Sequence, residues 1–220
     1  MGTVAGPQAP DKPDTRDVVA VHRVFRREFR QAADLVLQAP AGNLRRAAVI
    51  AGHLNLVIGA LHDHHQTQDE HLWPILLERA SMRADLVHRM EFQHDVIARH
   101  LATVQQLLNV WRRTAAASVA GELSSALRSM GKVVAEHLDD EEHDILPLVR
   151  DCLSQTEWAG LGARLPVDRT GLGLVLAEAS RTEARILLNR VPAQARLRWN
   201  VSGRHGYARY IKRVHGDALL

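Results

Sequence analysis

The stretch HDHHQTQDEHLWP, residues 62–74, constrains this chain most, because it places four histidines inside an apolar helical pattern. A second stretch has the same layout. His64 is followed four residues later by Gln68, and His137 is followed at the same distance by Glu141; a proline lies ten residues after each of these histidines. Because residues i and i+4 lie on the same face of a helix, each stretch points two polar groups in one direction. This spacing is typical of a metal site built on helices.

Four segments have the apolar periodicity of amphipathic helices, and each carries one histidine within its apolar stripe. The four histidines are His22, His64, His94 and His137. The predicted helices run from Thr15 to near Pro40, from Asn43 to about Trp73, from about Ser81 through Trp111, and from near Ser118 to about Arg150. Helices of this length joined by short loops predict an all-α fold, an up-down-up-down four-helix bundle over residues 16–152.

The spacing of these histidines suggests that one helix pair is repeated. His22 and His64 are 42 residues apart, and His94 and His137 are 43 apart. At a rise of 1.5 Å per residue, all four lie roughly 10 to 20 Å from the same end of the bundle. We therefore expect them to meet in one layer.

The composition of the chain indicates a soluble globular protein without intramolecular disulfide bonds. The chain of 220 residues is 46% hydrophobic and 24% charged, which is ordinary for a soluble globular domain. Cys152 is its one cysteine, so that an intramolecular disulfide and a cysteine-based metal site are excluded. Residues 1–15 are rich in Pro, Gly and Ala and are predicted to form a flexible lead-in without signal-peptide features. No transmembrane segment is predicted, and we expect a cytoplasmic protein.

Residues 153–220 are predicted to form a basic helical C-terminal extension. Within it, residues 177–220 hold nine Arg and Lys against three acids. Basic residues interleaved with Trp199, Tyr207 and Tyr210 could follow a nucleic acid or an anionic membrane. We favour a helical hairpin packed on the bundle, because the spacing of the aromatic residues would allow their burial.

A polar layer of this kind needs a partner inside the core. A buried imidazole or carboxylate without one costs several kcal/mol. Imidazole and carboxylate ligands suit iron, manganese, zinc or copper, and iron is the leading choice. A ferritin-like site would need Glu-x-x-His on two helices. Glu91 precedes His94 in this way, but Val134 stands three residues before His137.

These motifs resemble the hemerythrin-like, or HHE cation-binding, family over about residues 16–150: His on the first helix, His-His before Trp-Pro on the second, His on the third, and His-Leu-x-x-Glu-Glu before Leu-Pro on the fourth. The resemblance implies a non-haem diiron site with Glu141 bridging the two irons, and zinc or manganese are the alternative metals. It also implies reversible O₂ binding, sensing of oxygen or iron, or turnover of peroxide and nitric oxide. The implied ligands are His22, His64, His65, His94, His137 and Glu141.

The chain departs from the family pattern at two positions. Gln68 stands where the family usually has a second bridging glutamate, and Asp69 or Glu91 are the candidate substitutes. Ala98 stands where the third helix usually carries a second histidine.

Two other functions remain open from the sequence. One is a metal-dependent iron or redox sensor that acts through the basic extension. The other is a structural zinc site in which His22, His64, His94 and His137 close a tetrahedron.

Overall fold

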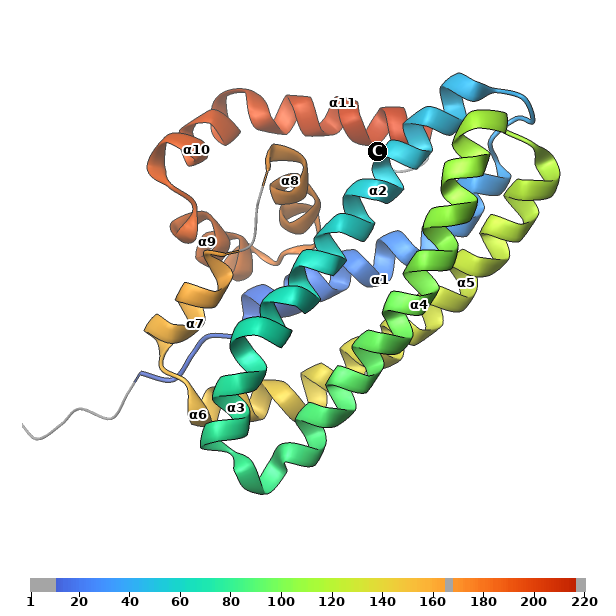
Figure 1. The fold of residues 1–220 in the computed structure, drawn as a ribbon. Coiled ribbons are helices and arrows are strands. Elements are labelled where there is room, and N and C mark those ends of the chain that lie inside the picture. Colours follow the sequence, from blue (N-terminus) through green and yellow to red (C-terminus); the bar gives the residue numbers. More distant parts are fainter. Residues whose placement is uncertain (1–10, 165–167, 217–220) are drawn as a thin grey trace, which may run out of the picture.

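The computed structural model describes residues 11–164 and 168–216, and the regular elements of these residues are all helices (Figure 1). The predicted all-α class is confirmed. Most of the predicted lead-in, residues 1–15, lies outside the described residues. Its last part, residues 11–15, runs to the bundle beside α7 (Gln155–Gly162), where the Asp11 carbonyl accepts a hydrogen bond from the Gln155 N–H.

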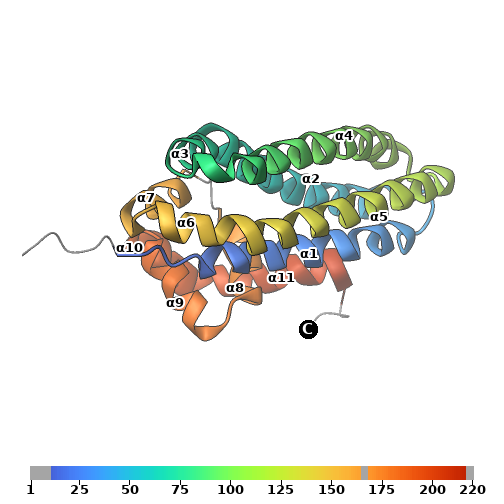
Figure 2. The ribbon, with the colours of Figure 1, turned by 90° about the horizontal axis from the view of Figure 1, so that it is seen from below.

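Four long helices form the body of the molecule. Each lies beside two others: α1 and α4 both neighbour α2 and α5 (Figures 1 and 2). Their apolar stripes meet in one core that includes Phe29, Leu54, Leu108 and Leu127. The bounds are α1 Arg16–Leu37, α2 Leu44–Thr67, α4 Ala84–Thr114 and α5 Ala117–Asp140.

Several helices begin or end close to the predicted residues, and local hydrogen bonds or backbone turns explain these ends. The Asn43 side chain accepts a hydrogen bond from the Arg46 N–H at 3.0 Å and so caps α2 as expected. Thr15 precedes α1 but makes no side-chain cap, and its hydroxyl accepts a hydrogen bond from Arg150 instead. Ala115, at φ 45°, makes the left-handed turn between α4 and α5.

The second long helix does not end at Pro74 as expected, and the fourth continues past Pro147 to Cys152, close to its expected end near Arg150. Each passes through one π-helical turn, η1 (Gln68–Leu72) or η3 (Glu141–Ile145), and continues as α3 (Trp73–Arg79) or α6 (Leu146–Cys152). Pro74 and Pro147 lie at the start of these short helices. A proline has no N–H to donate and its ring clashes with the preceding turn, so a widened turn accommodates it without breaking the helix.

A second apolar cluster closes the end of the bundle beyond these turns. It joins Trp73 and Leu76 of α3 to Met90 of α4 and to Ile145 and Leu146. The 3-10 turn η2 (Ser81–Arg83) connects α3 to α4 at this end. The polar layer is thus enclosed between two apolar clusters.

The C-terminal segment packs on the bundle as helices. Of these helices, α8 and α9 lie against α1 and α11 lies against α2, on the side of α1 away from α4 (Figure 2). Leu174 and Ile211 cover Val24 of α1. An added Cβ at Gly173 would lie 2.3 Å from the Tyr207 ring, so glycine permits this close approach. The bounds are α8 Arg169–Glu178, α9 Arg181–Arg190, α10 Ala193–Arg198, η4 Trp199–Gly203 and α11 Arg204–His215.

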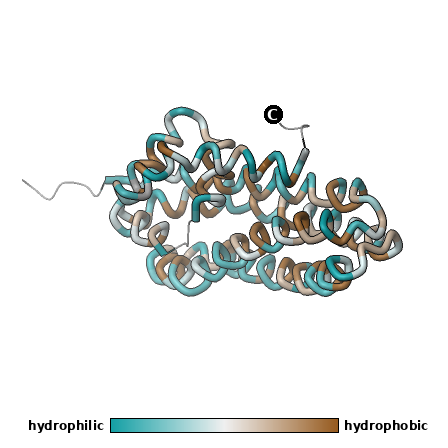
Figure 3. Tube along the Cα trace, turned by 90° about the horizontal axis from the view of Figure 1, so that it is seen from above, coloured by the Kyte–Doolittle hydropathy of each residue, from teal (hydrophilic) through white to brown (hydrophobic). Residues whose placement is uncertain are grey.

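Among the described residues, the segment Leu44–Arg79 alone is long and apolar enough to cross a membrane, by length and composition only. Leu54, Val57 and Leu61 of this segment are buried in the bundle core. Figure 3 shows polar and apolar residues alternating along the long helices. The core of the bundle therefore accounts for this hydropathy.

Candidate metal centre

Five histidines and one glutamate come together inside the bundle, from α1, α2, α4, α5 and η3. Each of these side chains belongs to a buried residue, at most 6% exposed. They form two groups, and within each group the candidate ligand atoms lie within 4.8 Å of one another. The first group is His22, His64 and Glu141, and the second is His65, His94 and His137.

One carboxylate oxygen is shared by the two groups. Glu141 Oε2 lies 3.3 Å from His22 Nε2 and 3.7 Å from His64 Nε2 in the first group. The same oxygen lies 3.8 Å from His137 Nε2 of the second group. Glu141 is therefore placed to contact cations in both groups.

The second group is a compact set of three rings. His65 stacks on His94 with centroids 4.1 Å apart, and both rings stand edge-on to His137 at 4.9 and 4.8 Å. Since Ala98 offers no ring on α4, the third imidazole of this group comes from His65 of α2. Two consecutive residues of α2, His64 and His65, thus serve different groups.

The atoms facing the centre have no hydrogen-bond partner among the described residues. A buried polar atom in this state costs free energy unless a ligand satisfies it. Most of these atoms are imidazole nitrogens or carboxylate oxygens that converge on one region, which is the arrangement that metal cations satisfy. The atoms are Nε2 of His22, His64, His65, His94 and His137, Oε1 of Gln68, and Oε2 of Glu141.

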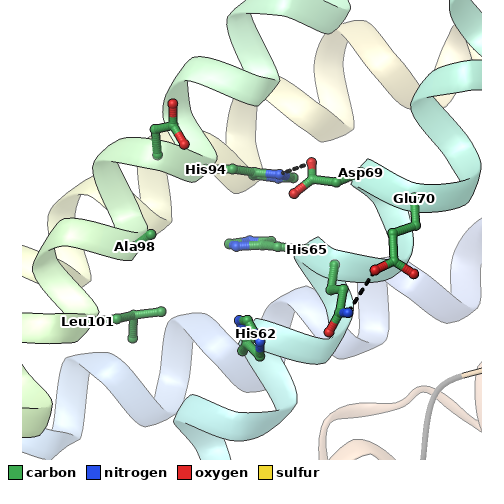
Figure 4. Close-up of a pocket in the computed structure, with 9 residues that line it drawn as sticks. His62, His65, Asp69, Glu70, His94, Ala98 and Leu101 are labelled. Atoms are coloured by element: carbon green, nitrogen blue, oxygen red, sulfur yellow. Dashed lines mark hydrogen bonds and ion pairs between the residues drawn. The ribbon is translucent and has the colours of Figure 1, made fainter.

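Three of the histidine rings are held by hydrogen bonds at Nδ1, the ring nitrogen that faces away from the centre. His94 Nδ1 donates to Asp69 at 2.7 Å, as Figure 4 shows, and His137 Nδ1 donates to Gln93 Oε1 at 3.0 Å. His22 Nδ1 donates to Glu142 at 2.9 Å. When the ring is neutral, each bond places its proton on Nδ1 and leaves Nε2 to face the centre, as partners of metal-bound histidines do.

The electrostatics of the second group favour neutral imidazoles. Burial lowers the pKa of His65 well below its usual value, and the neighbouring imidazoles lower it further. Burial, opposed by the nearby Glu141 carboxylate, brings the pKa of His137 to about 3. Neutral imidazole is the form that binds metal.

The first group attracts positive charge. Burial raises the pKa of Glu141, but His22 and His64 outweigh it and hold that pKa well below the usual range. Burial lowers the pKa of His22, and the carboxylates of Glu141 and Glu142 outweigh it, so that the pKa rises to about 9. The carboxylates of Glu141 and Glu142 therefore favour a cation beside them.

The three residues considered for the second bridging position, Gln68, Asp69 and Glu91, make different contacts in the structure. Gln68 is buried, and its amide Nε2 donates to Glu141 Oε1 at 2.6 Å. Asp69 binds His94 and also accepts from the Trp73 indole at 2.8 Å, so it orients a histidine. Glu91 does not join either group, because it lies on the exposed side of α4 and binds His88 at 2.8 Å.

Sequence reasoning missed the residues that support the rings. Glu142 binds His22 at 2.9 Å, and Asp140 accepts a hydrogen bond from Gln93 at 2.8 Å. Glu142 supports a histidine of another helix, His22 of α1. Asp140 supports His137 only through a second side chain, that of Gln93. No spacing within one helix signals such a contact.

A cavity of about 370 Å³ opens beside the second group. In Figure 4 the His65 and His94 rings lie one above the other at this cavity, with Ala98 and Leu101 across from them. The small Ala98 side chain leaves this space open. The lining residues are His62, His65, Gln66, Asp69, Glu70, His94, Asp95, Ala98 and Leu101.

A sequence model of the hemerythrin HHE cation binding domain matches residues 14–149. The matched span contains every residue of the two groups and stops before α7. Searches of curated proteins and of solved structures found no match.

Proposed function

Since the chain belongs to the hemerythrin HHE cation-binding family, we propose that its four helices form an up-down-up-down bundle around a dinuclear non-haem iron centre that binds or turns over O₂, peroxide or nitric oxide. One observation carries the proposal: buried lone pairs without partners converge in two groups that share Glu141. His22, His64 and Glu141 would hold one ion. His65, His94 and His137 would hold the other.

The donor set favours iron over the alkaline-earth cations. Five imidazoles and one carboxylate suit iron, zinc or copper, whereas magnesium and calcium prefer sites made of oxygen ligands. Bound iron would supply open coordination positions and a redox couple for the small molecule. The single-zinc alternative fits less well, because its four histidines divide between the two groups.

The chain's own residues would control access. The cavity reaches His65 and His94, and its rim carries the carboxylates of Asp69, Glu70 and Asp95. A rim of negative charge repels anions and leaves neutral molecules unaffected. O₂, hydrogen peroxide and nitric oxide are all small and uncharged. We also propose a reducing, cytoplasmic location, which suits a chain with one cysteine.

Metal analysis with optical spectroscopy tests the centre. Wild-type protein reconstituted with iron should hold two ions per chain and show near-ultraviolet charge-transfer bands that change with O₂, peroxide or nitric oxide. His65→Ala should lose at least the ion of the second group. His62→Ala is the matched control, because His62 is an exposed histidine at the same cavity and should keep both ions. Sub-stoichiometric iron without these bands would overturn the proposal.

A sensor remains the second candidate because α1 links the centre to the C-terminal helices. Arg23, next to His22, donates to the Glu178 carbonyl at 3.0 Å and to Glu183 at 2.6 Å. A shift of α1 on metal binding would reach α8 and α9 directly. Iron should then change the protease protection of residues 150–220, and equal protection with and without iron would exclude the sensor.

A further inference from the structure

A second cluster of metal-ligating side chains lies where the C-terminal helix meets the bundle. It joins Glu28 of α1, His53 of α2 and His215 at the end of α11. These side chains are 0%, 1% and 4% exposed. His53 precedes His64 by 11 residues, roughly 16 Å along a helix, so the cluster is separate from the centre described above.

The distances suit a single small cation. Glu28 Oε2 lies 2.9 Å from His53 Nε2 and 3.9 Å from His215 Nε2. Ligand atoms around a tetrahedral zinc ion, at bonds of about 2.0–2.2 Å, lie roughly 3.3 Å apart. The two observed distances fall on either side of that value. Small side-chain rotations would bring the three ligand atoms around one ion, because all three already lie within 4.8 Å of one another.

Neighbouring groups hold each of the three residues in place. The Tyr210 hydroxyl and His53 Nδ1 form a hydrogen bond of 2.8 Å, and Arg27 Nε donates to the other Glu28 oxygen, Oε1, at 3.0 Å. The Arg46 guanidinium donates to the carbonyls of residues 213 and 214 and so fixes the end of α11 beside His215. Supporting contacts of this kind orient metal ligands.

The protonation states also suit a cation. Burial raises the pKa of Glu28, but hydrogen bonds and charge from His53 and Arg27 outweigh it, so the pKa lies below the usual value. Burial lowers the pKa of His215. At neutral pH Glu28 is therefore a carboxylate and His215 a neutral imidazole.

A hydrogen-bond network alone explains only part of this cluster. A bond from His53 Nε2–H to Glu28 would satisfy His53, but the His215 ring then has no hydrogen-bond partner among the described residues. A cation between the three side chains satisfies both rings. We propose that Glu28, His53 and His215 bind one divalent transition-metal ion of the zinc type, which fastens α11 to α1 and α2.

Zinc titration of the iron-loaded, full-length protein tests this site. Wild type should bind one zinc ion per chain without change in the near-ultraviolet bands of the iron centre, and its midpoint of thermal unfolding should rise. His215→Ala should lose this zinc ion and the rise. His205→Ala should keep both, because His205 is an exposed histidine of the same helix.

Two results would overturn the proposal: wild type that binds no zinc beyond the iron centre, or His215→Ala that binds as much zinc as wild type. Crystals of wild type soaked in zinc give a test that needs no variant. Anomalous scattering at the zinc edge should place an ion between Glu28, His53 and His215. Anomalous peaks confined to surface histidines or to the iron centre would likewise contradict it.

Discussion

Gln68 shows how one residue changes the character of a buried site. Its amide donates to Glu141 Oε1 at 2.6 Å, at the position where the family resemblance implies a second bridging carboxylate. The amide therefore satisfies one oxygen of Glu141 and leaves Oε2 for the two histidine groups. Gln68 Oε1 remains available as a weak, uncharged ligand.

We predict that Gln68→Glu increases metal retention and destabilises the metal-free protein. The change would replace a hydrogen bond by two buried carboxylates in contact, at a cost of about 1–3 kcal/mol for the lost bond and the unpaired charge. A cation between them would relieve this repulsion. Chemical unfolding with and without iron, together with metal analysis, measures both effects.

Gln106→Glu is the control for this variant, because Gln106 is an exposed glutamine on α4. It should leave stability and metal content unchanged. Equal stability of Gln68→Glu and wild type without metal would contradict the hydrogen bond to Glu141.

At the scale of single elements, α9 depends on one carboxylate. Glu183 accepts from the Ser180 N–H at 2.7 Å, which caps the helix, and from Arg23 of α1 at 2.6 Å, which attaches it to the bundle. Burial raises the pKa of Glu183, but these bonds outweigh it and lower the pKa below its usual value of 4.5. The folded chain thus favours the ionised carboxylate.

The sign of this shift gives a pH dependence. Stability from Glu183 is fully present above pH 4.5 and is lost as the pH falls through the lowered pKa of the folded protein. Glu183→Gln should cost about 1 kcal/mol at pH 7 and make the region of α9 exchange amide hydrogens faster. At low pH the variant and wild type should converge. Hydrogen exchange at both pH values measures this, and Glu122→Gln, an exposed change on α5, should show no difference.

The two π-helical turns, η1 and η3, also depend on tertiary contacts. The sequence shows a proline ten residues after His64 and after His137, and it predicts that the second helix ends near Pro74. The neighbouring apolar cluster instead holds α3 against α4 and α6, so that each long helix widens by one π-helical turn and continues. These turns carry Gln68 and Glu141 at the centre.

At the scale of the whole molecule, the C-terminal helices pack on the four-helix bundle in the described part of the chain. Leu174 of α8 is 3% exposed and packs with Ile211 of α11 on Val24 of α1. Two of the three residues in the cluster at α11 also come from the bundle. The C-terminal helices and the bundle should therefore unfold together.

We predict that Leu174→Ala lowers the free energy of unfolding by about 2–5 kcal/mol in one cooperative transition, because it leaves a cavity between α8, α1 and α11. Leu197→Ala is the matched control, since Leu197 is 64% exposed and should change little. Urea unfolding followed by fluorescence and circular dichroism measures both variants. Two separate transitions, or no loss of stability, would contradict this single unit.

The sequence by itself determined the long helices, the presence of a buried histidine on each of them, and the Glu141 position one turn after His137. Those signals are local, because helical periodicity relates residues three and four apart on one segment. Tertiary structure alone decided that His65 joins His94 and His137, and that Glu28 and His53 meet His215. Such contacts depend on how each helix is rotated and placed against its neighbours, and the pattern of no single segment contains that information.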